Sequence, residues 1–71
     1  MKVRDINNTE IKVGDTVTKY AVMFDENSKH EQRVVKALAP MHENGEYMVW
    51  FVGGGGAHHP KACAVVRGGD K

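Results

Sequence analysis

The hydrophobic pattern of the chain is strongest over residues 46–52, where apolar side chains follow Glu46 without a break. Turn-forming residues bound this run on both sides, Asn44-Gly45 before it and Gly53–Gly56 after it. Its length and its β-branched and aromatic residues favour a strand over a helix. Side chains of a strand alternate between its two faces, so we expect Tyr47, Val49 and Phe51 on one and Met48, Trp50 and Val52 on the other. We therefore predict a central strand that is apolar on both faces.

Shorter patterns of the same kind predict further strands with polar loops between them. Thr16–Val22 favours an extended chain, and residues 25–29 form a polar loop. A last strand is expected over Ala62–Arg67. Residues 29–39 fit two structures. Ser28 with Glu31 matches a capping box for a helix that Pro40 would end, whereas adjacent valines in the segment Arg33–Leu38 favour a strand.

These elements predict an all-β domain of four to five short antiparallel strands, with an α+β fold as the alternative if residues 29–39 are helical. A chain of 71 residues builds one modest core. The two apolar faces of the central strand cannot easily share it. We expect Tyr47, Val49 and Phe51 to fill the interior, which leaves the opposite face to a partner or to a covering segment.

The phrase Ile11-Lys12-Val13-Gly14-Asp15-Thr16-Val17 resembles the opening of SH3-like barrels, among them the KOW and Tudor-type domains. The resemblance extends over residues 11–67. It implies an SH3-like barrel with a binding role. From the sequence itself we expect an N-terminal arm before it (residues 1–10) and a disordered tail after it (residues 68–71). The chain also resembles the small proteins of phages. No binding residue is carried over from these families.

The composition indicates which partners and which cellular compartment to expect. Ten basic and nine acidic residues give a formal charge of +1, which is weak support for binding nucleic acid through its phosphates. The single cysteine, Cys63, excludes an internal disulfide and fits a reducing compartment. No apolar run approaches the roughly 20 residues of a membrane span, and the N-terminus lacks the apolar stretch of a signal peptide. We expect a cytoplasmic protein without a membrane partner.

The exposed face of the central strand is the predicted binding site. An apolar patch that contains a tryptophan usually marks an interface, so Met48, Trp50 and Val52 are expected to bind a larger protein or a second copy of the chain. One form of this function is a phage-type inhibitor or adaptor that occludes a host protein surface.

Two other kinds of binding remain open. The first is nucleic-acid binding, for which one sheet face would gather the basic residues Lys19, Arg33, Lys36 and Arg67. The second is binding of a small anionic ligand such as a nucleotide in an oligomer. It would use the glycine loop and the adjacent histidines: Gly53, Gly54, Gly55, Gly56, His58 and His59.

Catalysis and metal binding have little support in the sequence. Residues His42, His58, His59 and Cys63 could suit a transition metal, but adjacent histidines in an extended chain point to opposite sides, so we expect no metal site and no cofactor. No motif activates Ser28 or Cys63 as a nucleophile. We expect the protein not to be an enzyme.

Overall fold

The computed structural model describes residues 2–40 and 45–66. Within them the fold is all-β, as predicted, with one short 3₁₀ helix. Five strands form one sheet in the order β4-β3-β2-β1-β5, and every neighbouring pair is antiparallel. The elements in chain order are β1 (Thr16–Tyr20), β2 (His30–Pro40), β3 (Tyr47–Phe51), β4 (Ala57–His58), η1 (Pro60–Ala62) and β5 (Cys63–Val65).

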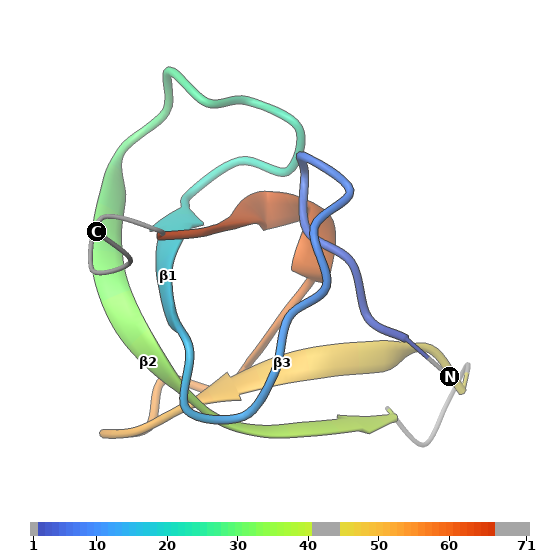
Figure 1. Cartoon of the computed structure of the whole chain (residues 1–71). Coiled ribbons are helices and arrows are strands. Elements are labelled where there is room, and N and C mark those ends of the chain that lie inside the picture. The colour runs from blue at the N-terminus through green and yellow to red at the C-terminus, as the bar shows by residue number, and fades with distance from the viewer. Residues whose placement is uncertain (1, 41–44, 67–71) are drawn as a thin grey trace.

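Strand β2 settles the alternative between helix and strand at residues 29–39. It is extended over His30–Pro40, and it pairs with β1 through its first half and with β3 through its second. Figure 1 shows β2 curving past β1 and then beneath β3. The pairing with β3 shifts register between Val35 and Ala37, which is a bulge at Lys36. Such a bulge bends a strand, so it lets one strand serve both parts of the sheet.

The core lies on the concave side of this bent sheet, which we call the inner face. The buried side chains come from every part of the described chain: Val3, Ile11, Val17, Val35, Val49, Phe51 and Cys63. Val49 and Phe51 are buried, and Tyr47 packs against the core from the same strand. The predicted inner face of the central strand is therefore confirmed.

The N-terminal residues belong to this core as well. Val3 is buried, and its carbonyl oxygen accepts a hydrogen bond from the Ile11 backbone at 2.8 Å. Asp5 is buried too, but its carboxylate accepts backbone hydrogen bonds from Asn7, Thr9 and Val65 at 2.7–2.8 Å. A buried carboxylate that is fully hydrogen-bonded avoids the desolvation penalty of an unpaired charge. Asp5 thus ties the N-terminal turn to β5.

Several predicted boundaries move by a few residues. Strand β1 ends at Tyr20 and not at Val22, because the chain turns there into a loop closed by the Ala21–Lys29 backbone hydrogen bond. Ala62 belongs to η1, so β5 begins at Cys63. Asn44 of the predicted turn, Arg67 and the predicted tail lie outside the described residues. No helix in the described part of the chain is long and apolar enough to cross a membrane.

The core predicts one large stability effect. Val49 is fully buried, so Val49→Ala should lower the free energy of unfolding by about 2 kcal/mol, through lost burial and the cavity left behind. The matched variant Val13→Ala truncates a side chain that is 62% exposed and should cost less than about 0.5 kcal/mol. Urea unfolding followed by circular dichroism measures both. Equal losses for the two variants would contradict this assignment of the core.

Candidate binding surface

The predicted partner-binding residues lie on the outer face of the sheet, opposite the core. Met48 and Trp50 alternate with the inner residues of β3 and are half-buried. Val52 follows β3 and is 56% exposed. The outer face of the central strand therefore carries large apolar side chains that are partly open to solvent.

Strand β2 widens this face. Ala37 pairs with Trp50, and Ala39 pairs with Met48. The Val52 backbone N–H donates to the carbonyl oxygen of Val34 at 2.9 Å, and the Val34 side chain is exposed. Together these residues form a continuous surface that we call the outer apolar stripe: Val34, Ala37, Ala39, Met48, Trp50 and Val52.

A cleft of about 290 Å³ lies beside Trp50. Small residues of β2 and of the glycine loop line it, together with Lys36 and Phe51. A Cβ added at Gly54 or Gly56 would meet no atom within 4 Å, so these two glycines leave the cleft open. The indole Nε1 of Trp50 is buried and has no hydrogen-bond acceptor among the described residues. The cleft is thus an apolar recess next to a cation.

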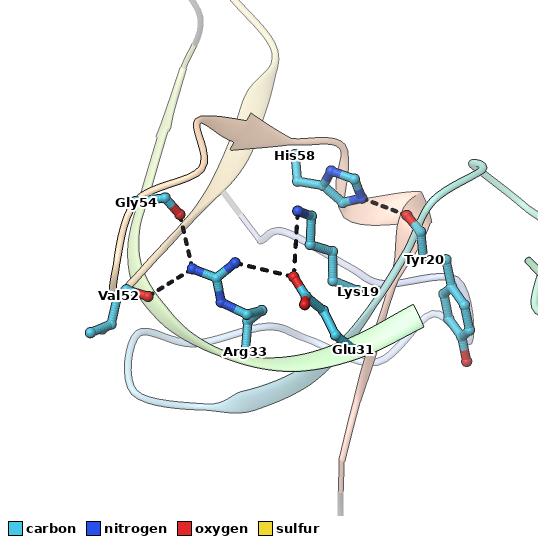
Figure 2. A network of polar contacts seen from close by, with 7 residues as sticks. All are labelled: Lys19, Tyr20, Glu31, Arg33, Val52, Gly54 and His58. Atoms are coloured by element: carbon cyan, nitrogen blue, oxygen red, sulfur yellow. Dashed lines mark hydrogen bonds and ion pairs between the residues drawn. The ribbon is translucent and has the colours of Figure 1, made fainter. Parts of the chain in front are cut away.

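A polar cluster occupies the inner face where β1 and β2 extend beyond β3. Figure 2 shows Lys19, Glu31 and Arg33 converging there. The Glu31 carboxylate lies 3.9 Å from the Lys19 ammonium and 3.3 Å from the Arg33 guanidinium. Both cations also lie over the ring of Phe51, at 5.9 Å and 5.4 Å from its centroid. The two cations cover one end of the core and share one acid.

Arg33 also fixes the start of the glycine loop. Its Nη2 donates to the carbonyl oxygens of Val52 and Gly54, both at 2.9 Å (Figure 2). A Cβ at Gly53 would stand 3.3 Å from the guanidinium, and all four glycines have positive φ. Glycine is needed here because other residues rarely adopt this backbone conformation. Arg33 therefore holds the predicted ligand loop to the sheet through the carbonyl oxygens of Val52 and Gly54.

The basic residues predicted for nucleic-acid binding are not gathered on one face in the described structure. Lys19 and Arg33 lie together on the inner face, where both contact Glu31. Lys36 lies at the bulge and lines the Trp50 cleft. Arg67 lies outside the described residues. A different cleft, of about 480 Å³, brings His59 of the predicted ligand loop together with Lys2, Arg4 and Lys61, three basic residues that were not predicted as a site.

The adjacent residues His58 and His59 form different hydrogen bonds. His58 Nε2 donates to the carbonyl oxygen of Tyr20 at 2.8 Å, which joins β4 to the end of β1 (Figure 2). The His59 ring accepts from the backbone N–H of Lys61 at 3.0 Å and so caps η1. Among the described residues no three His, Cys, Asp or Glu side chains lie close enough to hold a metal ion. His42 lies outside the described residues.

Cys63 directly follows η1, is buried and is a free thiol. Burial, with the nearby charge of Asp5, raises the pKa of the Cys63 thiol to about 12. A thiol with such a pKa carries almost no thiolate at neutral pH, and the thiolate is the nucleophilic form. Cys63 therefore acts as a small apolar core residue.

One exposed apolar segment was not among the sites predicted from the sequence. Val22, Met23 and Phe24 follow β1 and are exposed in the loop that leads to β2. Their only sequence signal was a short apolar run, of which Val22 was assigned to the first strand. Such a run does not tell an exposed loop from the end of a buried strand.

The Arg33 contacts predict a local stability effect. Arg33→Met keeps most of the aliphatic stem but removes the hydrogen bonds to Val52 and Gly54, so the free energy of unfolding should fall by about 1–2 kcal/mol. Amide exchange at Gly54 should accelerate. The control Lys12→Met removes the same charge from an exposed side chain and should change neither urea unfolding nor exchange. Unchanged exchange at Gly54 in the Arg33 variant would show that the guanidinium does not hold the loop.

His58 predicts a pH dependence. Burial lowers the pKa of His58, and the nearby Lys19 and His59 lower it further, although the hydrogen bond to Tyr20 opposes this. The unfolded chain then binds a proton at a higher pH than the folded chain does. The free energy of unfolding should therefore fall as pH drops below about 6.5 and toward the lowered pKa.

Urea unfolding at several pH values measures this effect against His58→Gln, whose amide can donate to Tyr20 but does not titrate. The wild-type chain should lose more stability between pH 7.5 and pH 5.5 than the variant. Parallel curves would contradict the assigned role of His58.

Comparison with other proteins adds no further evidence. No protein-family model, curated protein or solved structure matches the chain. We therefore infer its function from its own surfaces.

Proposed function

We propose that this chain is a non-catalytic protein-binding module that acts through the outer apolar stripe. One observation carries the proposal: the central strand buries Val49 and Phe51 on its inner face and still presents Trp50 and Met48 on its outer face. No described element forms a second layer over that outer face. A half-buried tryptophan among small apolar neighbours is a typical centre for a protein interface.

We also propose that the fold is a small SH3-like barrel. A bent β2 shared between β1 and β3 supports this, as does the hydrogen bond that joins β4 to the end of β1. No backbone ladder joins β4 to β5 among the described strands, and His58 of β4 reaches across to the carbonyl oxygen of Tyr20 in β1. Such a barrel offers its outer surface to a partner. An inhibitor or adaptor of phage type, acting in the cytoplasm by covering a site on a larger protein, fits this size and surface.

The charge distribution favours a protein partner over nucleic acid. Lys19 and Arg33 share Glu31, and the Arg33 guanidinium is also bonded to backbone carbonyls. Binding to a polyanion depends on cations that are free to neutralise phosphates. At the glycine loop, Arg33 donates to the carbonyl oxygens of Val52 and Gly54. These carbonyl oxygens carry partial negative charge, so this part of the loop does not attract an anion. The apolar stripe is the surface that these internal contacts leave unused.

Photo-crosslinking tests the proposal. A benzophenone amino acid is placed at Val52, in the stripe, and as a control at Asn7, an exposed residue of the N-terminal turn. After irradiation in a cell extract, the Val52 probe should capture discrete protein adducts that the Asn7 probe does not. Adding Val34→Lys to the Val52 chain should reduce their yield at least about fivefold, because it places a charge at the edge of the stripe.

Nuclease treatment and added salt should leave the adducts unchanged. Adducts of equal yield from both positions, or adducts that nuclease removes, would contradict a protein-binding stripe. Circular dichroism of each variant checks that the fold is retained.

A further inference from the structure

The loop between β1 and β2 carries the most exposed apolar group of the described chain outside the stripe. Val22, Met23 and Phe24 are 52%, 44% and 64% exposed. They are consecutive and all exposed, and we call them the apolar knob. Figure 1 places this loop at one end of the molecule and β3 toward the other. The knob therefore cannot reach the Trp50 cleft of its own chain.

The loop is held in shape by its own hydrogen bonds. The Ala21 backbone N–H donates to the carbonyl oxygen of Lys29 at 2.8 Å. The Val22 backbone N–H donates to the hydroxyl of Ser28 at 3.2 Å. That hydroxyl donates in turn to the carbonyl oxygen of Asp25 at 2.7 Å. The knob is thus presented on a formed loop, which reduces the ordering that binding would require.

Phe24 stands in a strained backbone conformation. Its φ is 65°, in the left-handed region that a bulky residue rarely adopts. Its backbone N–H donates to the carbonyl oxygen of Lys61 at 3.2 Å, which holds it there. Residues kept in such conformations cluster at functional sites. An asparagine would suit this φ better, so stability of the fold alone does not account for a phenylalanine here.

The Trp50 cleft has chemistry complementary to the knob. Asp25 and Glu26 follow the knob directly, and Glu26 is exposed. Lys36 lines the apolar cleft and makes no ion pair with any described residue. An apolar projection beside an acid thus matches an apolar recess beside a cation.

We propose that copies of this chain associate head to tail, with the apolar knob of one copy seated in the Trp50 cleft of the next. This rests on the proposed function, since it uses the same stripe, and it names the partner surface. Phe24 and Met23 would pack against Trp50 and the alanines of β2, while Glu26 would pair with Lys36. Because the two surfaces differ, a pair of copies still has one free knob and one free cleft, and the assembly grows into a ring or an open chain.

Sedimentation velocity of the purified chain over a wide concentration range tests this. The average mass should rise with concentration beyond that of a dimer. Phe24→Asn should weaken association at least about tenfold, as should Lys36→Glu, because each removes one side of the contact. Val13→Asn is the control, since it replaces an equally exposed valine that does not line the cleft.

Two combinations make the test specific to a head-to-tail contact. A mixture of the Phe24→Asn chain with the Lys36→Glu chain retains one intact knob and one intact cleft, so it should form one-to-one dimers and nothing larger. Glu26→Lys combined with Lys36→Glu in one chain should restore association. Circular dichroism should show each variant folded, with a melting temperature for Phe24→Asn no lower than that of the wild-type chain at a concentration where the wild-type chain is monomeric.

A chain that stays monomeric at the highest concentration overturns the proposal, as does association that Phe24→Asn leaves unchanged. In either case the proposed protein-binding function is tested separately, by whether the Val52 probe captures a different protein.

Discussion

The bulge at Lys36 is the feature on which the rest of the structure depends. A chain this short can enclose one core, and it does so by bending a single eleven-residue strand so that one half pairs with β1 and the other with β3. The bend brings Val17, Val35 and Val49 together on the inner face, where all are buried. It also sets the outer face, because the extra residue places Lys36 beside Ala37 and Trp50. The core and the apolar outer face are therefore two consequences of one irregularity.

Polar side chains join parts of the fold that the strand pairing does not connect. The backbone ladder does not join β4 to β5 in the described residues, and His58 of β4 reaches across to the carbonyl oxygen of Tyr20 in β1. Arg33 covers the Phe51 ring and holds the glycine loop, and Asp5 fastens the N-terminal turn to β5. Each of these groups is committed to structure. The side chains of the outer apolar stripe and of the knob make no polar contact of this kind in the described fold, which is why we propose that they bind partners.

The sequence was sufficient for the local pattern of the fold. Alternation in the run 46–52 correctly placed Val49 and Phe51 inside, because one face of a strand must fill the only core available. The adjacent valines correctly favoured a strand at residues 29–39. The bulge, the burial of Asp5 and the pairing of Arg33 with the glycine loop could not be predicted, because each depends on contacts between residues distant in sequence. The knob was missed for a related reason: whether an apolar run is buried depends on where the chain turns, and here it turns at Tyr20.

Quenching of tryptophan fluorescence tests the central claim most directly, because Trp50 is the only tryptophan and lies on the face in question. The claim is that the central strand faces the core on one side and solvent on the other. In a dilute monomeric solution, acrylamide should quench Trp50 more than it quenches a fully buried indole and less than it quenches the urea-unfolded chain. Quenching no greater than that of a fully buried indole would mean that the chain covers its own outer face, and it would contradict the account.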